Sequence, residues 1–243
     1  MISTKEPILN LINMRRFLIQ TIYGEVIHDF AWVLIQSCKY QNWNYNNNDL
    51  SYELVNDISD GDANKVPIGS VEFVEEYIHK FHGGVVNPIN VPEELFKFAE
   101  RKIFNGTLRD IPDVSFVKSN DIIKGSNPYL DIPVLDMNYQ ISDVITIDSE
   151  YRCFVYDKEI RGIYNYSGDI MLFPDPERIK LMLTAYSDPP IAYTLDVGIS
   201  SGKTVIIEVH NFFSCGLYGF ADHRILPQMF NSAFNEVISK YMV

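Results

Sequence analysis

The sequence lacks several features that would assign it quickly to a class of protein. It has three cysteines, Cys38, Cys153 and Cys215, at unrelated spacings. Because no two of them form a C-x-x-C pair, a disulfide framework is not expected and a reducing compartment is the default. No apolar run reaches the ~20 residues that a membrane-spanning helix needs. Neither G-x-G-x-x-G nor G-x-x-x-x-G-K-[ST] occurs, which argues against a Rossmann cofactor site and a P-loop.

Positive charge is also scarce. The chain has 20 Lys and Arg against 32 Asp and Glu, which gives a formal net charge of −12. Since a general nucleic-acid-binding protein needs clustered Lys and Arg, no nucleic-acid partner is expected. A nucleotide site is compatible with this charge, because a few local cations and a metal suffice there. The first residues lack the pattern of a signal peptide, so we expect a cytoplasmic protein with no membrane partner.

The chain does have a large apolar fraction and a change of pattern near residue 110. Hydrophobic residues make up 47% of its 243 residues, enough for a sizeable core. Up to that point, strand-like segments alternate with helix-like ones, which predicts a parallel α/β lobe. From Ile111 onward strands dominate.

The expected elements can be stated by range. In the first part we predict strands at 16–22 and 50–55, a helix at 25–40, a turn at 66–70, a helix from Ser70 to about Phe81, and a short helix from Pro92. In the second part we predict strands at 114–118, 141–147, 149–155, 160–166, 191–197 and 204–211, and helices at 176–186 and 226–241. Turns at 157–159 and 200–203 make two of these strand pairs hairpins.

Charged residues recur on these strands. Lys118 ends one strand, and Glu150 and Arg152 share a face of another. The second hairpin carries Asp196 on one arm and Glu208 on the other, so the two carboxylates should lie close together. Such carboxylates repel unless a metal or a proton lies between them, and Mg²⁺ with phosphate oxygens is the simplest resolution. Ordinary ion pairing among these charges is the alternative.

These segments resemble the ATP-grasp superfamily, and within it the clade named for one arginine and two lysines. The specific part of the resemblance is E-x-R at 150–152 together with the acidic pair Asp196 and Glu208. The matching runs are IGSVEFV at 68–74, FVK at 116–118, KG at 124–125, SEYRCFV at 149–155, AYTLDVG at 192–198 and IIEVHNFFSCGLYG at 206–219.

The resemblance implies an α/β fold in which two α+β lobes clasp ATP. The N-terminal lobe would span residues 1–110, the smaller clasping lobe 111–147 and the larger one 148–243. The residues implied to act on ATP are Lys118 and Lys124 at the phosphates, the backbone of Asp143, Val144 and Ile145 at adenine, Glu150 near the ribose or the metals, and Arg152 at the γ-phosphate. Asp196 and Glu208 would hold Mg²⁺, and Lys124 and Arg152 would be catalytic.

The third metal ligand departs from the family pattern. Many ATP-grasp enzymes have Asn two residues after the Glu, where this chain has His210, and Asn211 follows it. In a regular strand His210 shares the face of Glu208, whereas a bulge after Val209 would turn Asn211 inward. Both alternatives stay open from the sequence. Because imidazole suits Mn²⁺ or Zn²⁺ better than Mg²⁺, Mn²⁺ is a second candidate cofactor.

The activity implied by the resemblance is an ATP-dependent carboxylate–amine ligase that works through an acyl-phosphate. Its partners would be small-molecule or peptide carboxylates and amines. One alternative is a phosphotransferase that phosphorylates a hydroxyl on the same scaffold. The other is a nucleotide-binding regulatory module without turnover, which the altered third ligand suggests.

Overall fold

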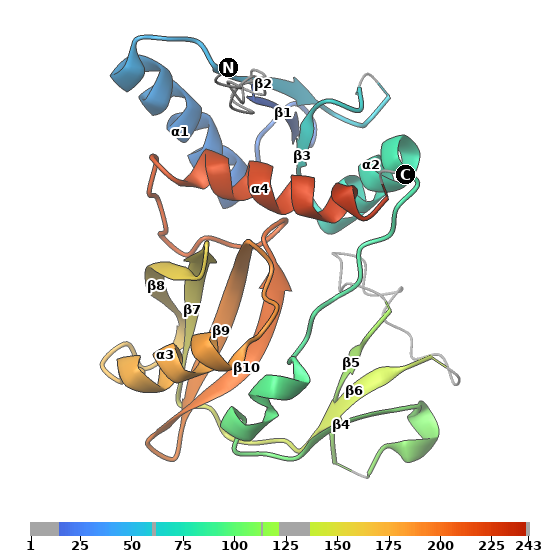
Figure 1. The fold of residues 1–243 in the computed structure, drawn as a ribbon, viewed down its shortest axis with the longest axis vertical. Coiled ribbons are helices and arrows are strands. Elements are labelled where there is room, and N and C mark those ends of the chain that lie inside the picture. Colours follow the sequence, from blue (N-terminus) through green and yellow to red (C-terminus); the bar gives the residue numbers. More distant parts are fainter. Residues whose placement is uncertain (1–14, 60–61, 113, 122–136, 242–243) are drawn as a thin grey trace, which may run out of the picture.

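The computed structural model describes residues 15–59, 62–112, 114–121 and 137–241. These residues form three β-sheets with helices packed around them (Figure 1). In Figure 1 the first sheet lies at the top, the second at the lower right and the third at the lower left. This mixed architecture confirms the predicted α/β fold class.

The first sheet is parallel and has the order β2-β1-β3, built from β1 (Arg15–Gln20), β2 (Leu50–Val55) and β3 (Val66–Ile68). The helices α1 (Asp29–Tyr45) and α2 (Val71–His82) belong to the same lobe. The central strand β1 is buried on both faces, as is usual in a parallel sheet that helices cover. This lobe therefore has the parallel α/β form that the sequence predicts.

The turn predicted over residues 66–70 is wrong in its first part. Val66–Ile68 form the short strand β3, which pairs with β1. Pro67 has no backbone N–H to donate, but it is tolerated because β3 lies at the edge of the sheet. The predicted helix cap is present, since the hydroxyl of Ser70 accepts a hydrogen bond from the backbone N–H of Phe73 at 3.2 Å.

The second sheet is antiparallel and has the order β4-β6-β5, from β4 (Ile103–Gly106), β5 (Phe116–Ser119) and β6 (Tyr139–Ser142). The 3₁₀ helices η1 (Glu93–Phe98) and η2 (Leu108–Asp110) flank β4. Because β4 pairs with β6, this sheet starts before the boundary predicted after residue 110. The strand predicted over 141–147 ends at Ser142, and residues 143–147 form an irregular connection.

The third sheet is antiparallel and has the order β10-β9-β7-β8. Its strands are β7 (Ser149–Tyr156), β8 (Glu159–Gly168), β9 (Ala192–Ser200) and β10 (Lys203–Asn211). Both predicted hairpins are present. One face of the sheet packs on α3 (Pro176–Ala185) and η1 through alternating apolar side chains. The other face carries the charged residues.

The last helix, α4 (Leu226–Ser239), packs between the first and third sheets (Figure 1). Its apolar side chains share one buried cluster with β1, α1 and α2, and with Phe154 and Phe212 of the third-sheet region. The C-terminal part of the predicted larger lobe therefore completes the core of the N-terminal lobe. Among the described residues, no helix combines the length and the hydropathy that crossing a membrane requires.

Candidate functional site

A row of charged side chains crosses the third sheet on the face away from α3. Both β7 and β10 pair with β9, and their registers set Arg152 and Glu208 on either side of Asp196. Directly paired residues of antiparallel strands share a face of the sheet and lie ~5 Å apart at Cβ. Charges from three separate sequence segments therefore become neighbours.

The first pair in this row is a buried, two-point ion pair. Nε and Nη2 of Arg152 donate to Oδ1 and Oδ2 of Asp196 at 2.8 and 2.7 Å, and Nη1 donates to the carbonyl of Gly216 at 3.1 Å. Only 8% of the Arg152 side chain and 1% of the Asp196 side chain are exposed. Burial alone would lower the pKa of Arg152, but the bonds to Asp196 outweigh it and raise that pKa. Arg152 is therefore a fixed cation.

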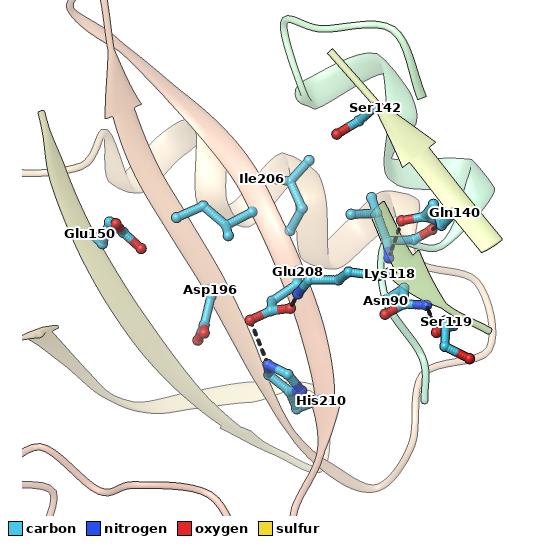
Figure 2. Close-up of polar contacts among 12 residues, drawn as sticks. Asn90, Lys118, Ser119, Gln140, Ser142, Glu150, Asp196, Ile206, Glu208 and His210 are labelled. Atoms are coloured by element: carbon cyan, nitrogen blue, oxygen red, sulfur yellow. Dashed lines mark hydrogen bonds and ion pairs between the residues drawn. The ribbon is translucent and has the colours of Figure 1, made fainter. Parts of the chain in front are cut away.

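Glu208 has two partners, one on the second sheet and one on the third. The partly exposed region where these side chains meet is called the cleft here. Its Oε1 lies 2.7 Å from Nε2 of His210, and its Oε2 is paired with the ammonium of Lys118. Lys118 belongs to β5, so this ion pair joins the two sheets. Figure 2 shows Lys118 extending from the second sheet toward Glu208, with Asp196 and His210 beside it on the third.

The imidazole of His210 is held in its neutral form. Burial is the main reason why its pKa is lowered to about 4; the charge of Asp196 opposes the shift, and the charges of Lys118 and Arg152 add to it. The ring is therefore neutral at pH 7, and one of its nitrogens has a lone pair. With 39% of its side chain exposed, His210 is still accessible from the cleft.

A β-bulge in β10 decides which side chains enter the cleft. The β9–β10 ladder shifts register between Ile206 and Glu208, so Ile207 is the extra residue. A bulge after Val209 was one of the two alternatives from the sequence, but the observed bulge lies before Glu208. Without it Ile207, and not Glu208, would oppose Asp196.

After the bulge the ladder is regular, so His210 lies on the same face as Glu208. Asn211 points to the other face, where its side-chain amide donates to the carbonyl of Asn87 at 3.1 Å. The alternative in which Asn211 turns inward as a metal ligand is therefore not the arrangement in this structure. His210, and not Asn211, lies on the same face as Asp196 and Glu208.

Three side chains meet closely enough to share a cation. One ligand atom each from Asp196, Glu208 and His210 lies within 4.8 Å of the others. Mn²⁺ binds readily to a set of two carboxylates and a neutral imidazole. Mg²⁺ binds the two carboxylates of this set well. The residues present therefore fit a divalent ion.

Glu150 lies apart from this cluster, two residues before Arg152 on β7. The hydroxyl of Tyr166 donates to its Oε2 at 2.7 Å. Tyr166 also stacks on Tyr218 with ring centroids 5.0 Å apart, and both rings lie against the guanidinium of Arg152. Two aromatic rings therefore shield one side of the buried ion pair, and the sequence had indicated neither of them.

The predicted adenine-binding segment lies in the irregular connection after β6. The backbone N–H of Asp143 already donates to the carbonyl of Lys102 at 3.1 Å. An adenine contact that uses this N–H would have to replace that bond. Val144 is exposed and Ile145 is half-buried. The predicted phosphate contact Lys124 lies outside the described residues.

Several polar residues that hold β10 in place were missed from the sequence. The carbonyl of Asn90 accepts from the N–H of Val209 at 2.7 Å, and its side-chain amide donates to the carbonyl of Ser119 at 2.8 Å. Gln140 exchanges two hydrogen bonds with the backbone of Val91. All these partners are far apart in the sequence, and no spacing or composition signal connects them.

Comparisons with known proteins agree with this architecture. Residues 98–227 match a family model for an ATP-grasp domain, that of family 2 in the clade named for one arginine and two lysines. No curated protein sequence matches the chain.

Solved structures of low sequence identity align with most of the chain. The D-cycloserine synthetase DcsG is 11% identical, with 92% of this chain and 99% of that chain covered and a TM-score of 0.50. A D-alanine–D-alanine ligase from Bacillus anthracis is 13% identical, with 93% and 98% covered and a TM-score of 0.48. A RimK domain ATP-grasp protein from Sphaerobacter thermophilus is 14% identical, with 93% and 98% covered and a TM-score of 0.43. Because the family model matches more than half of the chain, this protein belongs to the ATP-grasp superfamily, in family 2 of the clade named for one arginine and two lysines.

Proposed function

We propose that this protein is an ATP-dependent ligase that joins a carboxylate to an amine. The observation that carries the proposal is the cluster of Asp196, Glu208 and His210, faced by Lys118 from the opposite sheet. Membership of the ATP-grasp superfamily supports the binding of ATP. The substrates would be a small-molecule or peptide carboxylate and an amine.

The cluster would hold Mg²⁺ or Mn²⁺, which supplies positive charge to the phosphate oxygens of ATP. Lys118 would leave Glu208 and bind a phosphate when ATP enters the cleft. Lys124 is the second phosphate lysine of the proposal. Arg152 has five N–H donors and uses three on Asp196 and Gly216, which leaves two for the γ-phosphate.

In the proposed reaction an oxygen of the substrate carboxylate attacks the γ-phosphorus of ATP. The bond from that phosphorus to the bridging oxygen breaks, and ADP and an acyl-phosphate form. The amine nitrogen then attacks the acyl carbon, inorganic phosphate leaves, and the nitrogen loses a proton. The protein contributes positioning and charge neutralisation, which are its usual contributions to phosphoryl transfer.

The test measures ADP release with ATP, Mg²⁺ or Mn²⁺ and a pool of amino acids and peptides. Wild type should release ADP, and Glu208→Gln should lose at least about 100-fold of the rate, in the range seen when one electrostatic contact to a transition state is removed. The matched control is Glu159→Gln, a mostly exposed carboxylate on the same sheet, which should keep the wild-type rate.

Added hydroxylamine identifies the type of reaction. An acyl-phosphate gives a hydroxamate, whereas a phosphorylated hydroxyl does not. Equal ADP release by wild type and Glu208→Gln would refute the assigned site. ADP release without hydroxamate, when the pool contains an accepted substrate, would point to the phosphotransferase instead.

A further inference from the structure

Arg101 connects the loop after η1 to the bulged strand β10. Its Nη1 donates to the carbonyl of Ile206 at 2.7 Å, and its Nη2 donates to the carbonyl of Ile207 at 3.2 Å. Weaker bonds of 3.4 Å run from Nε to the hydroxyl of Ser142 and from Nη1 to the carbonyl of Ala99. One side chain therefore joins β10, the end of β6 and its own loop.

The two carbonyls that Arg101 binds are those of the bulge. A bulge leaves its extra residue unpaired in the ladder, and backbone groups removed from water need other partners. Because β10 is the edge strand of its sheet, that partner must come from outside the sheet. The planar guanidinium can donate to two neighbouring carbonyls at once, which an ammonium does less well.

The bulge determines the face on which Glu208 lies. In a regular ladder continuing from Ile206, the residue opposite Asp196 would be Ile207, and Glu208 would oppose Leu195 in the apolar core against α3. The bulge therefore moves a carboxylate from the core face to the cleft face. Any group that stabilises the bulge also stabilises the cluster.

We propose that Arg101 is a positioning residue for the divalent-ion site, because it holds the bulge at Ile207 and thereby keeps Glu208 opposite Asp196. The inference rests on the proposed function, since it concerns the same cluster. Among the described residues, Arg101 donates to Ser142, Ala99, Ile206 and Ile207, and makes no hydrogen bond to the three ligand side chains. It acts through the backbone of β10, from a position about a hundred residues earlier in the chain.

The experiment is a Mn²⁺ titration of the full-length, metal-free protein without nucleotide, with free Mn²⁺ measured by electron paramagnetic resonance. We expect Arg101→Met to weaken Mn²⁺ binding at least tenfold. Arg101→Lys should recover part of the loss. The matched control is Arg178→Met, because Arg178 also donates to a β10 carbonyl, that of Thr204, but before the bulge. This control should stay within about twofold of wild type.

Wild-type Mn²⁺ affinity in Arg101→Met would overturn the inference, and so would equal losses in Arg101→Met and Arg178→Met. Should Arg101→Met fail to fold, Arg101→Gln replaces it, since a single amide cannot bond both carbonyls. Wild-type Mn²⁺ affinity in Arg101→Gln would likewise overturn the inference. Absence of Mn²⁺ binding in wild type would instead refute the metal site of the proposed function, so the two failures are distinguishable.

Discussion

The buried ion pair between Arg152 and Asp196 allows a quantitative test of how the site is built. With 8% and 1% of the two side chains exposed, neither charge can be rehydrated when its partner is removed. Removing one partner of such a pair costs about 3–5 kcal/mol, whereas replacing both with apolar residues is often close to neutral. We therefore expect Arg152→Met and Asp196→Leu each to lower the free energy of unfolding by about 3–5 kcal/mol.

The double variant should lose much less than the sum of the two. Its main remaining cost is the carbonyl of Gly216, which loses the bond from Arg152 and leaves an unsatisfied acceptor worth about 1–3 kcal/mol. The coupling energy between the two substitutions is then at least about 3 kcal/mol. Contacting residues commonly couple by up to about that amount, and distant ones by less than about 0.5 kcal/mol.

The assay is thermal and urea unfolding of the four proteins in metal-free buffer. At ~2.1 cal/mol/K per residue, a chain of this length shifts its Tm by about 2 °C for each kcal/mol. Each single variant should therefore lose about 6–10 °C, and the double variant about 2–6 °C. Additive losses would show that Arg152 and Asp196 contribute independently, and would refute the reasoning from their burial.

Three further predictions concern the cluster in the cleft. His210→Asn should weaken Mn²⁺ binding about tenfold, or ~1.4 kcal/mol, because oxygen replaces the nitrogen donor. Mg²⁺ binding should change less. Equal losses of Mn²⁺ and Mg²⁺ affinity in calorimetric titrations would contradict the assigned ligand. Lys118→Met should tighten Mn²⁺ binding in the absence of nucleotide, because the ammonium competes with the metal for Glu208. The same variant should weaken ATP binding, because the ammonium then binds phosphate. Calorimetry in which both affinities fall would count against this exchange. Deletion of Ile207 should leave Mn²⁺ affinity within about threefold of wild type, because a regular ladder then pairs Glu208 with Asp196. A complete loss of Mn²⁺ binding, measured by paramagnetic resonance, would show that the bulge does more than correct the register.

The hairpin of β9 and β10 shows how far the sequence can be read. Its alternation and its turn predict that Asp196 and Glu208 lie close together, and the structure places them opposite each other. Counting pairs outward from the turn, however, sets Ile207 against Asp196. The prediction of closeness is therefore confirmed, whereas pairing counted from the turn without a bulge would be off by one residue.

The reason for that difference lies outside the hairpin. The bulge depends on Arg101 and on the neighbouring contact of Asn90 with Val209, and both partners are far from β10 in the sequence. The position of α4 is similar, since its amphipathic pattern predicts a helix but not which sheets it packs between. Local pattern fixes the type of an element, whereas its partners depend on contacts distant in sequence.

The two interpretations of the charged residues, ion pairing and metal binding, are compatible in this structure. Asp196 and Glu208 each have a cation of their own, Arg152 and Lys118, which removes the repulsion between the carboxylates without a metal. The two cations differ in how firmly they are held. Arg152 is fixed by two bonds to a carboxylate of the same sheet and by one to the carbonyl of Gly216, in the segment after β10.

Lys118 comes from the opposite sheet, keeps 27% of its side chain exposed and offers a single ammonium on a flexible stem. Under the proposed function, a divalent ion that binds Glu208 would compete with Lys118 and would leave the pair of Arg152 with Asp196 in place. Under the proposed function, the released ammonium would then be available to the negatively charged phosphates of ATP. On this reasoning, metal and nucleotide should each favour the binding of the other, and Lys118 is the side chain through which they do so.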